Sequence, residues 1–228
     1  MSFILFIREN LPFVLRIIQG AKYTLLIAIT SGFFGVIIGT LMALFKQSRI
    51  RVLRALATLY TDILRGTPVI LQLSMMHFVV FGMVNIPPVY SAIAALSLNS
   101  GAYLAEVIRA GIQNIDRGQI EAAEALGVHR KYVLMDIILP QAFRNIIPPI
   151  INELAALVKE SSIVYIIGVA DIMLETNRTT AKTFLYFEPL FVASICYYVL
   201  VKLIITIGKR LEVKYNVHSS QQPQQILS

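Results

Sequence analysis

The sequence predicts an all-α integral membrane protein with about five transmembrane helices. Hydrophobic residues make up 57 % of the 228 residues and charged residues only 14 %, and the mean hydropathy is +0.71. That balance is typical of membrane-embedded chains and not of a soluble core. The length suits one domain with about five spans of ~20 residues. The net charge of +7 does not indicate nucleic-acid binding, because the basic residues flank apolar segments, as the positive-inside rule describes.

The first span is predicted over about residues 23–45. Gly32, Gly35 and Gly39 within it are spaced for close contact with another helix. Residues 46–54 follow with four basic residues and no acidic one, which marks a cytoplasmic loop. The first span therefore runs from the outside to the cytoplasm.

The second apolar segment is predicted to contain a break. From Val52, apolar residues recur at helical spacing and indicate a half-buried helix at the membrane interface. The segment Arg65–Pro68 interrupts it, with Thr67 expected as a cap and Pro68 in the first turn of a new helix that reaches about Val84. Two roles are open for Arg65, anchoring lipid headgroups or pairing with an acid near a gate. The recurring apolar positions are Leu53, Leu56, Tyr60 and Ile63.

The remaining segments complete the predicted topology. A third span over residues 89–110 is rich in small residues suited to helix packing. The polar segment 116–140 carries several basic residues and is expected in the cytoplasm. A fourth span is predicted to begin at Pro148-Pro149 and to end near Val169. Residues 171–188 are expected to form an external loop, and a fifth span over residues 191–207 ends at basic residues.

Segment 116–140 is predicted to fold as two short helices that project from the membrane. Asp116 and Gln119 have the spacing of a capping box. Gly127 is the residue type that ends a helix in a left-handed conformation. A second helix is expected from about His129 until Pro140 stops it. Such a projection has the form of a docking knob, and we call residues 116–140 the knob.

The knob carries a motif that resembles the cytoplasmic coupling motif of permease subunits of ATP-binding-cassette importers. The flanks of the motif are similar to the polar amino acid permeases of that superfamily, and the likeness covers roughly residues 20–210. The coupling residues that the resemblance implies are Glu121, Ala122, Ala123, Gly127, Ile137, Leu139 and Pro140. The similar flanking segments are Arg65–Pro68, Leu98–Tyr103, Arg109–Gly111, Pro140–Phe143 and Lys159–Ser162.

The resemblance implies the type I importer transmembrane fold, with the N-terminus outside and the C-terminus in the cytoplasm of a bacterial inner membrane. Three domain parts are expected: an external segment 1–18, a transmembrane domain 19–211 and a cytoplasmic tail 212–228, which is predicted to be disordered because it is rich in glutamine from Ser219 onward. The partners implied are a second permease subunit, two ATPase subunits and an external amino-acid-binding protein. The chain itself has no phosphate loop and is expected to be a transport subunit, not an enzyme, with ATP and Mg bound by the ATPase partner. ATP binding would close the ATPase pair, and the knob would pass that motion to the spans.

Polar residues inside the spans are the candidates for the substrate pathway. Ionisable groups in a span cost ~2.5–3.5 kcal/mol on insertion scales and usually face a pathway or a partner. The alternative for Lys159 and Glu160 is that they pair with other charges to hold the bundle together. The pathway candidates are Asn99, Tyr103 and Glu106, which form a stripe on the third span, and Glu153 and Glu160, which share a face of the fourth.

Other site chemistry finds no support in the sequence. Cys196 is the single cysteine and lies in an apolar run, so a disulfide framework is excluded. The three histidines are scattered without ligand spacing, and no metal site is expected. The alternative function is an ion- or proton-coupled secondary transporter, which would be expected to show inverted repeats. The transported amino acid, the identity of the second permease copy, and the Gram-negative or Gram-positive source stay open.

Overall fold

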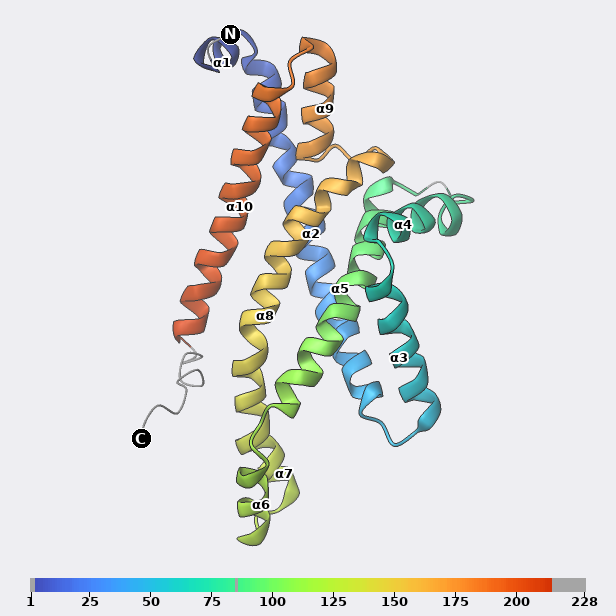
Figure 1. The fold of residues 1–228 in the computed structure, drawn as a ribbon, viewed down its shortest axis with the longest axis vertical. Coiled ribbons are helices and arrows are strands. Elements are labelled where there is room, and N and C mark those ends of the chain that lie inside the picture. Colours follow the sequence, from blue (N-terminus) through green and yellow to red (C-terminus); the bar gives the residue numbers. More distant parts are fainter. Residues whose placement is uncertain (1–2, 85, 215–228) are drawn as a thin grey trace, which may run out of the picture.

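The computed structural model describes residues 3–84 and 86–214, and every regular element in those ranges is a helix (Figure 1). The predicted all-α class is therefore confirmed. The elements are α1 (Phe3–Glu9), α2 (Leu11–Lys46), α3 (Arg51–Gly66), α4 (Val69–Ser74), the π-helical η1 (Met75–Val80), α5 (Pro88–Gln113), α6 (Arg117–Ala125), α7 (Arg130–Tyr132), the π-helical η2 (Val133–Ile138), α8 (Leu139–Glu160), the 3-10 helix η3 (Ser161–Ile167), α9 (Ile172–Thr183) and α10 (Phe187–Lys214).

Helices α2 and α5 form the centre of the bundle, and small residues let them approach closely. A Cβ built on Gly39 would lie 2.7 Å from Leu104 Cβ, and one built on Gly35 would lie 2.8 Å from Ser100 Oγ. The predicted packing role of these glycines is confirmed. The core around this pair also takes in α4 and α8, and its fully buried large side chains are Ile27, Leu73, Leu96 and Leu157.

Helix α3 follows the predicted burial at only some positions. Its buried residues are Ala57 and Thr61, while Leu56 and Ile63 are more than half exposed. The expected half-buried apolar face is confirmed in part: Leu53 and Tyr60 are half-buried, whereas at the contact itself small residues are buried and Leu56 and Ile63 face outward. Helix α3 and the segment Val69–Val80 meet at an angle of 107°.

The break between α3 and α4 uses Thr67 and Pro68 differently from the prediction. Thr67 does not cap α4; its Oγ1 donates a hydrogen bond back to Ile63 O at 2.8 Å. Pro68 precedes the first residue of α4 with extended backbone and makes no side-chain cap. The chain therefore turns at an extended Thr67-Pro68 pair, as the restriction on residues that precede proline predicts.

Prolines also fail to mark the helix ends that were predicted at Pro140 and at Pro148. Pro140 lies in the first turn of α8, directly after the π-helical η2, and the helical run passes through it. Pro148 and Pro149 lie inside α8, so this helix begins well before the predicted start. The predicted end near Val169 is confirmed, because η3 continues the helical run from Glu160 to Ile167 and Gly168 follows in a left-handed conformation. A fixed proline φ is compatible with a helix, and neighbouring helices make such prolines tolerable in membrane proteins.

The predicted external loop 171–188 contains a helix, α9, which Asp171 caps by accepting a hydrogen bond from Leu174 N at 2.8 Å. Two spans are also longer than predicted, since α2 begins at Leu11 and α10 runs over Phe187–Lys214. Helix α10 thus includes the first residues of the predicted tail, and residues 215–228 lie outside the described residues.

The number of spans is lower than the prediction when it is judged by helix length and composition. Among the described residues, α2, α5 and α10 are long and apolar enough to cross a membrane, and the bent α3–α4–η1 segment is a fourth candidate. Helix α8, the expected fourth span, is not among these candidates; it carries Arg144, Glu153, Lys159 and Glu160. The molecule is an all-helical membrane protein with three to four candidate spans.

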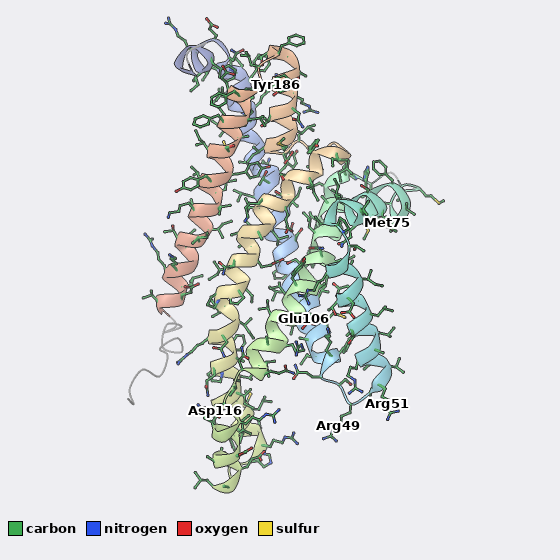
Figure 2. All side chains as sticks on the ribbon, in the orientation of Figure 1. Arg49, Arg51, Met75, Glu106, Asp116 and Tyr186 are labelled. Carbon is green, nitrogen blue, oxygen red and sulfur yellow. The ribbon has the colours of Figure 1, made fainter. Side chains whose placement is uncertain are left out.

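The two ends of the bundle differ in chemistry. Helices α6 and α7 project past the ends of α5 and α8, opposite α1 and α9 (Figure 1). Arg49 and Arg51 lie at the same end of the molecule as Asp116, and Tyr186 lies at the other end (Figure 2). The basic loop and the knob thus share one end, which is the arrangement that the positive-inside rule describes for the cytoplasmic side.

Candidate functional site

The knob begins at a helix cap that the sequence predicted in part. Asp116 Oδ1 accepts a hydrogen bond from Gly118 N at 2.7 Å, so Asp116 caps α6. The reciprocal half of the capping box is absent, because the Gln119 side chain turns to the neighbouring helix. Gln119 Oε1 accepts a hydrogen bond from Gln141 Nε2 at 2.7 Å. This bond ties the first turn of the knob to the first turn of α8.

The end of α6 is fixed by Gly127, as predicted. Gly127 has a φ of +74°. Its N–H donates to Glu124 O at 3.0 Å, and Val128 N donates to Ala123 O at 3.0 Å. These two bonds are the pair that defines a Schellman motif, in which glycine is favoured because it has no Cβ. The elbow of the knob therefore has a single defined backbone geometry.

The second half of the knob is not one helix that stops at Pro140. His129 Nδ1 accepts a hydrogen bond from Lys131 N at 3.3 Å and caps the single-turn α7. The chain then continues through η2 directly into α8. The second half of the knob therefore joins α8 without an intervening loop.

Some of the predicted coupling residues are exposed on the knob, and others are buried or half-buried where its two halves pack together. Ala123 is buried beside η2, where Val133 is buried as well. Glu121 and Ala122 are exposed, Ile137 and Leu139 are half-buried, and Pro140 is exposed. The knob also presents large apolar side chains to its surroundings, namely Leu126, Tyr132, Leu134 and Met135.

Glu106, a predicted pathway residue, is held by two cations. Its carboxylate pairs with Lys46 Nζ and with Arg109, whose Nη2 lies 2.8 Å from Glu106 Oε2. Lys46 Nζ also donates to Thr61 Oγ1 at 2.7 Å. The cluster joins the end of α2 to α3 and α5, so its first consequence is structural (Figure 2 labels Glu106). Lys46 was not singled out in the sequence, where it appeared only as a basic loop residue.

Asn99 and Tyr103 each contact the α3–α4 break. Asn99 is 4 % exposed, and its Nδ2 donates to Gln72 Oε1 at 3.0 Å. Arg65 stacks over the Tyr103 ring, with Cζ 5.4 Å from the centroid. That contact is neither of the two roles expected for Arg65. The three residues of the predicted stripe thus have separate partners, and their part in a substrate pathway stays a prediction.

Glu153 is the predicted pathway residue that lines a cavity. The cavity of about 270 Å³ lies between α2, α5 and α8. Glu153, Glu160 and Lys159 make no ion pair within 4 Å among the residues that the structure describes, so the pairing alternative for Lys159 and Glu160 finds no support there. The other cavity walls are apolar and comprise Ile29, Gly32, Phe33, Val36, Ile37, Leu104, Ile150 and Leu154.

Asp171 is a buried acid that the sequence reasoning placed in a loop. It is 0 % exposed, and Gly20 of α2 packs against its backbone, where a Cβ would lie 2.6 Å from Asp171 C. Tyr197 donates a hydrogen bond to Asp171 Oδ2 at 3.3 Å. Burial raises the pKa of Asp171 to about 6, although the bonds from Leu174 N and Tyr197 oppose the shift. Its position directly before α9 was the available signal, since aspartate is a favoured N-cap.

Three comparisons with known proteins bear on this arrangement. Residues 35–216 match the family model described as binding-protein-dependent transport system inner membrane component. A relative from Rickettsia felis, provisionally named glutamine transport system permease protein GlnP, is 44 % identical over 209 residues, which are 91 % of this chain and 96 % of the relative. The arginine transport system permease protein ArtQ of Bacillus subtilis is 45 % identical over 207 residues, covering 90 % and 93 % of the two chains.

A solved structure is similar over nearly the whole chain. It is the crystal structure of an amino acid ABC transporter with histidines, with a TM-score of 0.83 and 34 % sequence identity. The match covers 94 % of this chain and 99 % of the solved one. The likeness therefore includes both the bundle and the knob.

Proposed function

This chain belongs to the family of binding-protein-dependent transport system inner membrane components, and from that premise we propose how its residues serve the import of an amino acid. It is a permease subunit of an ATP-binding-cassette amino acid importer in the inner membrane, and ATPase activity lies in partner subunits. The observation that carries the proposal is the knob, a two-part projection with a fixed elbow at the basic end of the bundle.

The proposed topology has five spans, with the N-terminus outside and the C-terminus in the cytoplasm. The spans are α2, the bent α3–α4–η1 segment, α5, α8 and α10. Helix α8 packs against α2, α5 and α10, which supports counting it as a span in spite of its charges, because charged groups in a span normally face a bundle interior or a partner.

The proposed partners dock at opposite ends. Two ATPase subunits, which bind ATP and Mg, contact the knobs of two permease copies, identical or different. An external binding protein delivers the amino acid at the end of α1 and α9. Leu126, at 83 % exposure, and the exposed Glu121 are suited to contact an ATPase surface, since apolar anchors beside a charge-assisted hydrogen bond are typical of such interfaces.

The geometry gives a direct route for coupling. The knob joins α5 at one end and continues into α8 at the other, and the Gln119–Gln141 bond closes its base. Displacement of the knob by the closing ATPase pair therefore moves α5 and α8, which carry Glu106 and Glu153. We propose that this motion alternates the pathway between inward-facing and outward-facing states.

Glu153 is proposed to face the amino acid. A carboxylate on a largely apolar cavity wall can bind the ammonium group of the substrate while the walls accept apolar parts. The relatives are named for glutamine and arginine, so a polar amino acid is the proposed substrate class. Asn99, Tyr103, Glu106 and Glu160 remain weaker candidates for the same pathway.

Reconstitution tests the proposal. Proteoliposomes that contain this chain, its ATPase partner and its binding protein are expected to import amino acid only with ATP. Vesicles with this chain alone are expected to show no uptake. Uptake by the chain alone, driven by an ion gradient, would overturn the proposal in favour of a secondary transporter.

A further inference from the structure

The break between α3 and α4 leaves particular backbone carbonyls without their helical partners. In an α-helix the N–H of residue 68 would donate to the carbonyl of Leu64, but Pro68 has no N–H. Because α3 ends at Gly66, Ile63 O loses its helical donor as well. In a bilayer such unpaired groups cost several kcal/mol each. The 107° bend therefore requires other donors at this place.

Side chains supply donors to Ile63 O and Leu64 O. Thr67 Oγ1 donates to Ile63 O at 2.8 Å. Gln72 Nε2 donates to Leu64 O at 2.8 Å and to Thr67 O at 3.2 Å. Asn99 Nδ2 approaches the same Leu64 O at 3.4 Å. The carbonyl that Pro68 leaves unpaired is thus the one on which two amide side chains converge.

The two amides also bind each other across two helices. Asn99 Nδ2 donates to Gln72 Oε1 at 3.0 Å, while Gln72 Nε2 is engaged with Leu64 and Thr67. A primary amide has two donor hydrogens and one acceptor oxygen, so it can pair with the freed backbone and with a second amide at the same time. We call the Gln72–Asn99 pair the amide clasp.

The clasp stabilises the bend between α3 and α4 and also attaches this bend to α5. Gln72 belongs to α4 and Asn99 to α5, and two further contacts join α3 to the same stretch of α5. Tyr60 Oη donates to Leu98 O at 2.6 Å, and Arg65 stacks on Tyr103. Three contacts at neighbouring positions hold α3, the break and α4 against one side of α5.

We propose that Gln72 and Asn99 are positioning residues for transport, which lock the α3–α4 bend to α5 so that the bend moves as one body with α5 when the knob is displaced. The inference rests on the proposed function, because α5 leads into the knob. It assigns to Asn99 a contact with the bend and assigns no substrate contact to it. Loss of the clasp frees the bend, and ATP hydrolysis then proceeds without a matching displacement of the pathway.

The first experiment measures amino acid uptake and ATP hydrolysis on the same proteoliposomes of the complete complex. Gln72→Leu is expected to lower uptake per ATP about tenfold, since an unpaired buried acceptor shifts an equilibrium by roughly that factor or more. Ser74→Ala is the matched control, because within the described residues Ser74 Oγ bonds to Ile70 O of its own helix and to no other group. The control is expected to match wild type. A merely structural role would instead lower hydrolysis and uptake in proportion.

A double-mutant cycle separates the clasp from a substrate contact. If Gln72 and Asn99 act as one unit, the double leucine variant is no worse than the more damaging single variant. Additive losses, or an Asn99→Leu effect confined to the KM for amino acid, would overturn the proposal. Failure of the wild-type complex to import with ATP would count against the proposed function and not against the clasp.

A second measurement does not require transport. Spin labels at the exposed Leu59 of α3 and Leu71 of α4, in a Cys196→Ala background, report the distance across the bend. Gln72→Leu is expected to broaden the distance distribution, while Ser74→Ala leaves it narrow. An unchanged distribution in Gln72→Leu would show that the bend holds without the clasp and would overturn the proposal.

Discussion

Two residues are in unusual local environments: Gly127 has a left-handed backbone, and Asp171 has a buried carboxyl group. Gly127 occupies the left-handed region, and apart from its two chain neighbours no described residue has an atom within 4 Å of a Cβ built on it. Any defect from a side chain there comes from the backbone conformation and not from crowding. Asp171 is the reverse case, with an ordinary backbone and a carboxyl enclosed by protein. A substitution at Gly127 therefore tests the backbone conformation alone, and a substitution at Asp171 tests the burial of the carboxyl group alone.

Gly127→Val is expected to leave the protein in the membrane and to reduce uptake strongly. A side chain in the left-handed conformation costs about 1–2 kcal/mol, and a β-branched one more. Gly127→Asn is the control, because asparagine tolerates this conformation, and it is expected to retain most uptake. Normal uptake by the valine variant would show that the elbow is not needed for coupling.

Asp171 is expected to give stability a distinct pH dependence. The folded pKa of about 6 lies above the ordinary 3.8, so the folded state binds the proton more tightly than the unfolded state. Stability should fall as pH rises from about 4 to about 6, by an amount on the order of 2–3 kcal/mol, and level off above. Melting curves in detergent at several pH values check this against Asp171→Asn, which should lack the decline and still cap α9. The exposed Asp136→Asn should keep it.

Among the contacts between helices, those made by the glycines of α2 could be predicted from the sequence. Gly35 and Gly39 approach α5, and a Cβ on Gly32 would lie 3.1 Å from Leu154 Cδ1 of α8. All three were predicted from spacing alone, because small residues at helical intervals have few other uses in a membrane helix. The ends of helices were less predictable, since Pro140, Pro148 and Pro149 are accommodated by packing that only the folded bundle provides.

Gly39→Leu is expected to destabilise the α2–α5 pair by at least about 1–3 kcal/mol, the usual range for overpacking a core. The nearest atom to a Cβ there is Leu104 Cβ at 2.7 Å, and the backbone atoms Ala105 N and Gly101 O lie only 3.0 and 3.1 Å away. Gly66→Leu is the matched control, with no atom within 4 Å and no left-handed backbone. Thermal unfolding in detergent should separate the two variants. Equal melting temperatures would mean that α2 and α5 move apart at little cost.

Helix α8 is expected to present Glu153 to water in at least one transport state. In a Cys196→Ala background, Glu153→Cys should react with a small membrane-impermeant thiol reagent, and substrate should protect it. Ala155→Cys is the control, because Ala155 is buried on the same helix. If Glu153→Cys stays unreactive with and without nucleotide, the residue serves packing and the substrate route lies elsewhere.

At the scale of the whole molecule, the sequence motifs predicted the architecture better than the length and apolar content of the individual helices did. The coupling motif and its flanks indicated the family, while length and composition support only three to four spans. The difference lies in α8 and in the bent α3–α4–η1 segment, whose polar or interrupted sequences are acceptable only against neighbouring helices. The Lys46–Glu106 ion pair and the packing of Asp171 against α2 and α10 could not be predicted, because both join residues distant in the chain.

The five-span topology can be checked with reporter fusions to chains truncated at successive loops. Alkaline phosphatase is expected to be active outside the membrane, and green fluorescent protein to fluoresce in the cytoplasm. Phosphatase activity at Asn114 would contradict the cytoplasmic knob. The expected outside positions are Val84 and Phe184, and the expected inside positions are Gln47, Asn114 and the C-terminus.

The ion pair between Lys46 and Glu106 has a consequence for biosynthesis. The two residues are 60 positions apart, which at 5–20 residues per second corresponds to about 3–12 s of translation. During that interval Glu106 has not yet been synthesised, and Lys46 lies at the cytoplasmic boundary of the membrane, where a cation is tolerated. Glu106 follows in a segment that must enter lipid, and a nearby cation removes most of the penalty for its charge. The order of synthesis therefore places α2, with Lys46 at its cytoplasmic end, in the membrane before the helix that carries Glu106.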